Sequence, residues 1–406
     1  TPTAALAGPV APPWRLVHTL GVAQIVSWGS LYYAFPLFVV PMEAELGWGR
    51  AAMNGALTLG LLTAGLTAFP AGRWLDRKGG RLLMTAGSCL GAACLLLWAG
   101  VEDLWLLYAL WIGIGIAQAA TLYEPGFAVV AAAFGADYRR GITALTLWGG
   151  FASTVFVPLT QLLIELLGWR GALVGLAGFN LLLGAALHWT VLAGVGPRHG
   201  AAPAAPGPGQ SAALAMASRS PVFWSLLVAM AAYAITFSAM TFHMVPLLTE
   251  RGVPIASVVA AIAIVGPAQV AGRILLASTR GRVGARGAGR ITVLLLPVAI
   301  LMLLAHLPGF AWLAAFAAVY GVANGVMTIV RSTSIPDLLT REAYGTLNGA
   351  MAAPAMVLKA LAPLAAAWLW AVSGGYDAVL WACLAGALVC AATFWLATLL
   401  ARPQAL

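Results

Sequence analysis

The sequence predicts an all-α polytopic membrane protein, with twelve transmembrane helices in two six-helix bundles. Of its 406 residues, 62% are hydrophobic and only 8% are charged, and the mean hydropathy is +0.94. Soluble domains carry about 25% charged residues. Apolar runs long enough to span a bilayer follow one another with short connections, which leaves no room for a large extramembrane domain. No short apolar region with a small-residue cleavage site opens the chain, so we expect the first run to be a retained span.

Apolar runs bounded by turn and charge signals define the twelve expected spans. Those of the first half are Leu16 to Val40, Ala51 to Ala71, Leu82 to Ala99, Leu104 to Phe134, Gly141 to Leu167 and Gly171 to Ala193. Those of the second half are Val222 to Leu248, Pro254 to Thr279, Gly289 to Leu307, Phe310 to Val330, Tyr344 to Val372 and Tyr376 to Leu400. Residues 194–220, rich in Ala, Pro and Gly, predict a flexible linker between domains at 1–193 and 221–406.

Basic residues predict the orientation, because Lys and Arg in short loops are retained on the cytoplasmic side. With both termini inside, fifteen of the 21 basic residues are cytoplasmic and three, Arg50, Arg170 and Arg251, are outside. This topology, which we expect in a bacterial inner membrane, explains the net charge of +9 without nucleic-acid binding. The four cysteines and five histidines show no metal-binding spacing, so no metal or cofactor is expected.

Two cations lie inside spans that hold no other charge. Lys359 is the only charged residue from Thr346 to Val372, and Arg273 is the only one from Pro254 to Thr279. A cation at bilayer depth costs at least about 2.5 kcal/mol on insertion scales and persists where it faces a cavity or an anionic partner. Guanidinium and ammonium groups both bind carboxylates, so the pair predicts a site for a small organic anion. The alternative for Arg273 is that its side chain extends to the cytoplasmic surface.

Two titratable residues are candidates for proton coupling. Glu124 is the one acidic residue well inside a span, and it can either carry a proton or pair with a cation; both roles stay open. His243, near the outer end of the seventh span, can titrate near neutrality or serve as a hydrogen-bonded interfacial histidine.

Polar aromatic and amide residues complete the expected pocket. Tyr33, Tyr123 and Asn324 are the candidate substrate contacts, and the alternative for each is packing at headgroup depth. Prolines interrupt several spans, which is typical of helices that rock around a midplane site; they are Pro36, Pro125, Pro158, Pro267, Pro354 and Pro363.

The segment between the second and third spans reads Gly72-Arg-Trp-Leu-Asp-Arg-Lys-Gly-Gly-Arg81. It resembles the G-x-x-x-D-R-x-G-x-R signature of the major facilitator superfamily. The resemblance implies that Gly72 permits close helix approach and that Asp76 accepts hydrogen bonds at a helix terminus. It also implies that Arg77 and Arg81 complete a charge network that locks one conformation.

Further segments resemble the monocarboxylate porters and the oxalate/formate antiporters of that superfamily. They are Tyr32-Tyr-Ala-Phe-Pro-Leu-Phe38, Glu45-Leu-Gly-Trp-Gly-Arg50, Phe134-Gly-Ala-Asp-Tyr-Arg-Arg-Gly141, Gly168-Trp-Arg170, His243-Met-Val-Pro-Leu-Leu-Thr-Glu-Arg-Gly252 and Gly266-Pro-Ala-Gln-Val-Ala-Gly-Arg273. The resemblance implies that Arg273 and Lys359 occupy the positions of the carboxylate-binding arginine and lysine of those families.

The sequence therefore predicts a secondary transporter, not an enzyme, that moves a mono- or dicarboxylate by proton symport or anion exchange. We expect it to act as a monomer in the lipid bilayer. One alternative is an exporter of amphipathic drugs or metabolites in the same fold. Another is a polytopic membrane enzyme or sensor, which should show clustered catalytic or metal-ligating residues or a soluble output domain.

Overall fold

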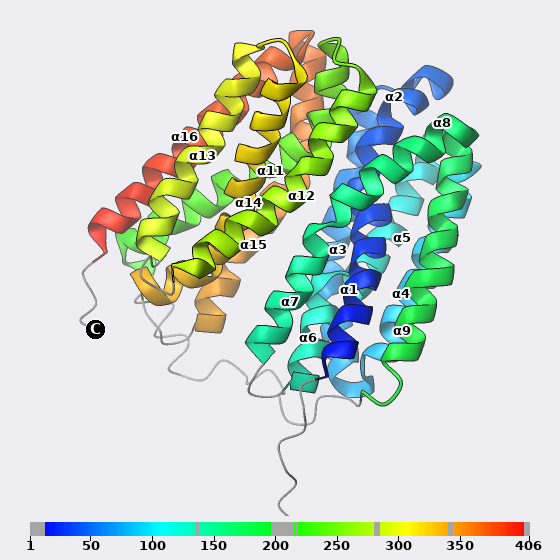
Figure 1. Ribbon diagram of the computed structural model, residues 1–406, viewed down its shortest axis with the longest axis horizontal. Helices are drawn as coiled ribbons and strands as arrows, with labels where there is room; N and C mark the ends of the chain where they lie inside the picture. The colour runs from blue at the N-terminus through cyan, green and yellow to red at the C-terminus, as the bar shows by residue number, and fades with distance from the viewer. Residues whose placement is uncertain are drawn as a thin grey trace, which may run out of the picture.

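The computed structural model describes residues 13–134, 138–195, 215, 218–279, 285–339 and 344–401. Every regular element in these ranges is helical, and the helices form two groups that lie side by side (Figure 1). The first group comprises α1 (Trp14–Trp28), η1 (Gly29–Tyr33), α2 (Phe35–Leu46), α3 (Arg50–Lys78), α4 (Gly80–Ala99), α5 (Leu104–Thr121), α6 (Tyr123–Phe134), α7 (Tyr138–Gly150), α8 (Ala152–Phe179), η3 (Asn180–Ala185) and α9 (Ala186–Val191). The second comprises α11 (Pro221–Glu250), α12 (Ile255–Ser278), α13 (Ala285–Ala305), α14 (Phe310–Leu338), α15 (Tyr344–Ser373) and α16 (Tyr376–Leu400). Most of the expected linker, including residues 196–214, lies outside the described residues.

The predicted fold class is confirmed. Eleven segments of the described chain are long and apolar enough to cross a membrane, and one of them, Arg140–Val191, has 52 residues. A straight helix of that length would measure about 78 Å, more than twice the thickness of a bilayer core. It is broken at Gly168, whose φ of 70° and ψ of 170° are not helical. The chain runs through α7 and α8 to the other end of the bundle and returns to α9 (Figure 1), so this segment crosses twice. The described part of the chain therefore makes twelve crossings.

The second span is longer than expected. We expected it to end at Ala71 and a loop to follow, but α3 continues to Lys78 and ends only at Gly79, whose φ is 80°. The residues after Pro70 include good helix formers and no further proline, so nothing stops the helix as it leaves the apolar region. The segment that carries the superfamily signature is therefore mostly helical.

The fourth span, expected as one helix from Leu104 to Phe134, is broken in the middle. Leu122 has β backbone angles, with α5 before it and α6 after it. Pro125 explains the break, because it lacks an N–H and its ring clashes with the carbonyl four residues earlier, that of Thr121. The Gln24 side chain of α1 donates to the carbonyls of Thr121 and Leu122, at 2.7 and 3.3 Å.

A proline in α15 frees a backbone carbonyl in the same way. Pro363 has no N–H for the carbonyl of Lys359, four residues earlier. The Ser238 hydroxyl of α11 donates to that carbonyl at 2.7 Å. Within a bilayer every backbone polar group needs a partner inside the protein. Ser238 therefore fixes the backbone of Lys359 against α11.

In α12 the replacement donor comes from the other bundle. Pro267 frees the carbonyl of Ala263, and the Thr154 hydroxyl of α8 donates to it at 2.9 Å. The neighbouring Gly266 lets the two helices approach closely. A Cβ at Gly266 would clash with Thr154 Oγ1 and would lie 2.6 Å from the carbonyl oxygen of Gly150. The bundles thus touch backbone to backbone at this crossing.

The first span contains a π-helical segment, Gly29–Tyr33, in which the Ala34 N–H bonds to the carbonyl five residues earlier at 3.0 Å. In this register Pro36 leaves the carbonyl of Leu31 without a backbone donor. The Gln118 amide of α5 donates to Leu31 at 2.7 Å instead. Such single-turn π segments are frequent at functional sites.

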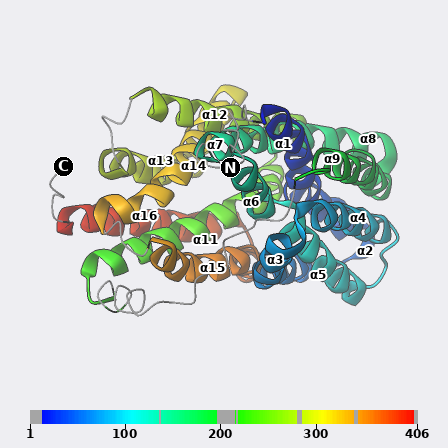
Figure 2. The same ribbon diagram turned by 90° about the horizontal axis from the view of Figure 1, so that it is seen from below.

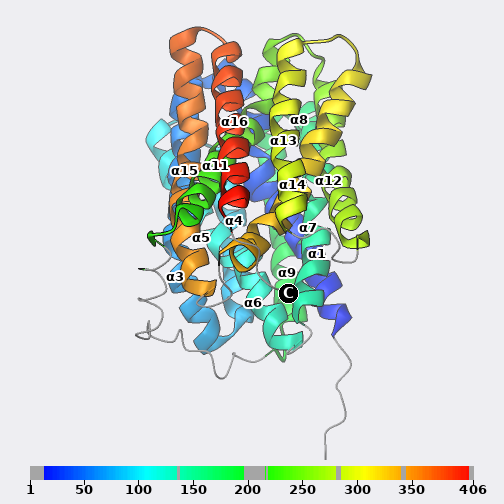
Figure 3. The same ribbon diagram turned by 90° about the vertical axis from the view of Figure 1, so that its left-hand side faces the viewer.

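Four pairs of helices make the main contacts between the two bundles, α3 with α15, α8 with α12, α2 with α11 and α7 with α12. The α3–α15 pair is plain in Figure 2. Away from this contact, α13 and α16 form the front of the view in Figure 3. They carry exposed large apolar side chains suited to lipid, including Leu294, Leu301, Leu388 and Leu399.

Candidate functional site

A cavity lies between the two bundles, with α1, α3, α5 and α6 on one side and α15 on the other. Its polar lining includes Lys359 near the middle of α15, Glu124 at the start of α6 and Gln118 in α5. Apolar and aromatic residues make up the rest, namely Trp28, Tyr32, Leu61, Ala64, Gly65, Ala68, Ala119, Leu122, Met356 and Ala360. Ligand sites between helices of bundles have this mixed character.

The ammonium group of Lys359 is available in this cavity. Its Nζ lies 5.2 Å from the centre of the Tyr32 ring, within the range of a cation–π contact. No described residue forms a hydrogen bond or an ion pair with the ammonium. A cation at this depth without a protein anion requires another partner, such as water or an anionic ligand.

Glu124 belongs to the same cavity, where its side chain is exposed. It lies in the first turn of α6, and a carboxylate in that position interacts favourably with the positive end of the helix dipole. It forms no ion pair with Lys359 in the described part of the chain. The break at Leu122 creates this helix start, so the fold itself accounts for an acidic side chain at membrane depth.

Aromatic side chains of the first bundle pack together beside Lys359. The Trp28 ring lies 5.1 Å from that of Tyr32 and 4.9 Å from that of Tyr123. Tyr33 is 5.1 Å from Tyr32, which contacts Phe242 of the second bundle at 4.8 Å. The structure thus brings the predicted Tyr33 and Tyr123 into one cluster with Trp28 and Tyr32.

Arg273 has different neighbours from Lys359. Its Nη1 donates to the Thr146 carbonyl of α7 at 2.9 Å, and its Nε lies 3.4 Å from the Gly325 carbonyl oxygen of α14. It does not line the cavity of Lys359. Arg273 therefore bridges the two bundles through a backbone carbonyl.

The remaining predicted contacts lie in the second bundle or on its border. Asn324 accepts a hydrogen bond from the Tyr233 hydroxyl at 2.8 Å. Tyr33 also lines a second, smaller cavity together with Gln269 and Tyr320. None of these residues lines the cavity of Lys359.

His243 is buried away from the central cavity, among α11, α15 and α16. Its Nε2 lies 2.8 Å from the carbonyl oxygen of Pro363, and its Nδ1 lies 2.9 Å from the Tyr376 hydroxyl. A carbonyl can only accept, so this network assigns the proton to Nε2 and makes Nδ1 the acceptor from Tyr376. Both ring nitrogens are satisfied by the protein.

The signature residues lie at the junction of α3 and α4. Arg81 donates to the Trp189 carbonyl at 2.9 Å, and its guanidinium lies 3.8 Å from the centre of the Trp189 ring. A Cβ at Gly72 would meet no described atom within 4 Å, so the expected close approach is not made in this conformation. Arg77 is exposed, and the Asp76 side chain lies outside the part of the chain that the structure describes.

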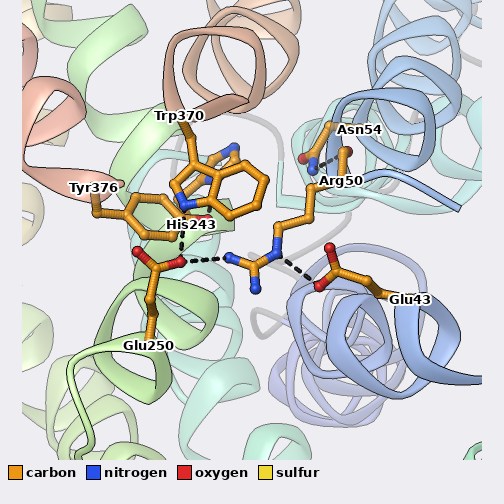
Figure 4. Close-up of polar contacts among 7 residues, drawn as sticks. All are labelled: Glu43, Arg50, Asn54, His243, Glu250, Trp370 and Tyr376. Carbon is orange, nitrogen blue, oxygen red and sulfur yellow. Dashed lines mark hydrogen bonds and ion pairs between the residues drawn. The ribbon is translucent and has the colours of Figure 1, made fainter. Parts of the chain in front are cut away.

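An ion pair that the sequence did not single out joins the bundles at the end where α2 and α11 finish, which we call the closed end. Arg50, at the start of α3, donates through Nε to Glu43 at 2.8 Å and through Nη1 to Glu250 of α11 at 3.0 Å (Figure 4). Its guanidinium lies 4.2 Å from the centre of the Trp370 ring, and the Trp370 indole donates to Glu250 at 2.8 Å. Only 13% of the Arg50 side chain is exposed, which limits screening by solvent.

Two other arginines at the closed end form ion pairs within a bundle. Arg170 pairs with Glu45 at 3.0 Å in the first bundle, and Arg251 pairs with Asp377 in the second. The sequence contained a signal for these contacts, since all three arginines that we expected outside have acidic residues at neighbouring span ends. It could not indicate that only Arg50 reaches across to the other bundle.

Comparison with known proteins identifies the class. The fold resembles solved membrane transporters at low sequence identity. A bacterial homolog of the human lysosomal transporter Spinster, in an inward-facing and unoccupied conformation, has a TM-score of 0.72 at 13% identity, covering 97% of this chain and 98% of that chain. The nucleoside transporter NupG, as its D323A mutant, has a TM-score of 0.71 at 13% identity, covering 96% and 99%. Curated protein sequences give no significant match.

The family follows from the sequence itself. Residues 20–306 match the model of the Major Facilitator Superfamily, and the chain belongs to that superfamily. It is an integral membrane protein of the secondary-transporter class, and the family indicates a transporter rather than an enzyme.

We predict that Arg50→Ala favours separation of the bundles at the closed end. The variant removes the ion pair with Glu250 and the contact with Trp370. Losing about 1 to 2 kcal/mol would shift the equilibrium between conformations about 5- to 30-fold. The measurement is the distance between spin labels on cysteines placed at Glu102 and Pro308, with the four native cysteines replaced.

The matched control is Arg170→Ala, which breaks an ion pair at the same end but within one bundle. It should leave the label distances as in the parent protein, while Arg50→Ala adds a longer-distance population. Identical distributions for Arg50→Ala and the parent would show that Arg50 does not hold the bundles together.

Proposed function

We propose that this protein is a secondary transporter of a small organic anion, a carboxylate, that works by alternating access between the two bundles. The observation that carries the proposal is the ammonium of Lys359, which lies at mid-depth in a cavity between the bundles with no anion from the described part of the chain bound to it. A carboxylate in that cavity would form a charge-assisted hydrogen bond with the ammonium and compensate its desolvation.

Arg273 takes a second role in this proposal. One N–H of its guanidinium donates a hydrogen bond to the Thr146 carbonyl of the other bundle. A guanidinium has five N–H donors in all. It can therefore hold the bundles in this conformation and still attract an anion toward the aromatic cluster. Its contact with Thr146 must break when the bundles move apart, which couples this cation to the conformational change.

Glu124 is compatible with two modes of energy coupling, proton symport and anion exchange. As a proton carrier it would lose and regain a proton during each cycle, giving symport. As a fixed carboxylate at the start of α6 it would only balance the charge of Lys359, and transport would then be exchange of one anion for another. His243, whose ring nitrogens are both occupied by Tyr376 and Pro363, supports a structural role.

The distribution of basic residues supports one orientation of the protein in the membrane. With both termini in the cytoplasm, the closed end with Arg50 faces outward, and the structure corresponds to an inward-facing state of a bacterial inner-membrane protein. The inward-facing conformation of the Spinster homolog is consistent with this assignment. An exporter of amphipathic compounds in the same fold would not need the free ammonium of Lys359.

We predict that Lys359→Gln lowers carboxylate transport at least about tenfold, because the charge-assisted hydrogen bond is worth about 1.5 to 3 kcal/mol. The measurement is uptake and counterflow of labelled mono- and dicarboxylates in proteoliposomes. Arg290→Gln is the control, since Arg290 binds Thr398 away from the cavity. Transport by Lys359→Gln at the parent rate would refute the anion site.

A second prediction separates the coupling modes. If Glu124 carries the proton, an inward proton gradient accelerates uptake by the parent protein, and Glu124→Gln abolishes this acceleration while counterflow persists. Uptake that responds to the gradient equally in both proteins would exclude Glu124 as the carrier.

A further inference from the structure

The cavity of Lys359 has features that restrict the anion further. They are the number of free charges in the cavity, the aromatic residues beside the ammonium, the space on the α3 wall and the cavity volume. Together they define one chemical class of substrate.

The charges favour an anion with a single carboxylate. Among the described residues, Lys359 is the one cation that lines this cavity, and Glu124 is the one carboxylate. Arg273 lies outside the lining and is bound to backbone carbonyls. A second carboxylate on the substrate would therefore find no second cation in the described lining, and an ionised Glu124 would repel it.

The surroundings of the ammonium are aromatic. Lys359 Nζ lies over the Tyr32 ring, and Tyr32 packs against Trp28. A carboxylate bound to the ammonium would therefore place the rest of the substrate beside these two rings. The Trp28 indole N–H is also buried without a hydrogen-bond partner in the described structure. A buried donor of this kind is a suitable partner for a polar ligand atom.

Besides Leu61, the α3 wall carries three small residues at helical spacing. Ala64, Gly65 and Ala68 line the cavity from one face of α3. A Cβ at Gly65 would meet no described atom within 4 Å, so the space beside it is open. Small residues here leave room for a flat group next to the aromatic rings.

The size agrees with one ring. The cavity volume is about 110 Å³, of the same order as a protein cavity of about 150 Å³ that binds benzene.

We infer that the substrate is a monocarboxylate carrying one aromatic ring, with its carboxylate on Lys359 and its ring beside Trp28 and Tyr32. The inference rests on the proposed function, because it names the substrate of the same site. Aromatic rings prefer offset or edge-to-face contacts with other rings, so an aromatic acid should bind better than a saturated acid of equal size.

The test is inhibition of counterflow in proteoliposomes by benzoate, cyclohexanecarboxylate, propionate and succinate. We expect benzoate to bind about tenfold more tightly than cyclohexanecarboxylate and propionate, with succinate the weakest. Gly65→Leu, which fills the open space, should weaken benzoate binding about tenfold more than propionate binding. Gly178→Leu is the matched control, since a Cβ at Gly178 in α8 would also meet no described atom within 4 Å, but Gly178 does not line the cavity.

The outcomes distinguish the two proposals. Transport of propionate or succinate without preference for benzoate overturns this inference alone and leaves the proposed function standing. Equal affinity for benzoate and cyclohexanecarboxylate, or an unchanged benzoate preference in Gly65→Leu, also overturns it. If no carboxylate is transported or bound, the proposed function fails as well.

Discussion

Backbone carbonyls that prolines free within the membrane are the constraint on which this structure depends. A bilayer offers no water to satisfy them, so each needs a donor from the protein. Three polar side chains supply one, each to the carbonyl four residues before a proline: Gln24 for Pro125, Ser238 for Pro363 and Thr154 for Pro267. These bonds fix the position of the broken helices relative to their neighbours, and two of the three lie at the candidate site.

The functional residues follow from that constraint. The break before Pro125 turns the middle of a span into a helix start and places Glu124 there. The freed carbonyl of Lys359, held by Ser238, fixes the backbone that carries the free ammonium. The bond from Thr154 crosses between the bundles, as do those of Arg273 and Arg50. The contacts that must change during alternating access are therefore few, polar and identifiable.

The fold class could be predicted from the sequence, because apolar runs of sufficient length indicate the membrane spans and polar or basic segments indicate the connections between them. We expected a boundary between two spans near Gly168, and the helix is broken at this residue. Lys359 stood out because a lone charge in an apolar run is costly. Pro125 predicted an interruption of the fourth span, but not that the span divides into two helices at Leu122, because the hydropathy continues through the break.

Other parts of the site could not be predicted, because they depend on pairing between distant helices. Nothing in the local sequence indicates that Arg50 pairs with Glu250, 200 positions later. For the same reason Arg273 and Lys359, alike in sequence, have different surroundings. The donor for each freed carbonyl also lies far away in sequence. Ser238, for example, precedes Lys359 by 121 positions.

The most direct test of this account is a double-mutant cycle on Ser238 and Pro363. Ser238→Ala should destabilise the protein in detergent, because the Lys359 carbonyl loses its donor. In a Pro363→Ala background the backbone N–H of residue 363 can satisfy that carbonyl, so Ser238→Ala should cost about 1 kcal/mol less. Additive effects of the two substitutions would contradict the claim that proline-freed carbonyls organise the site.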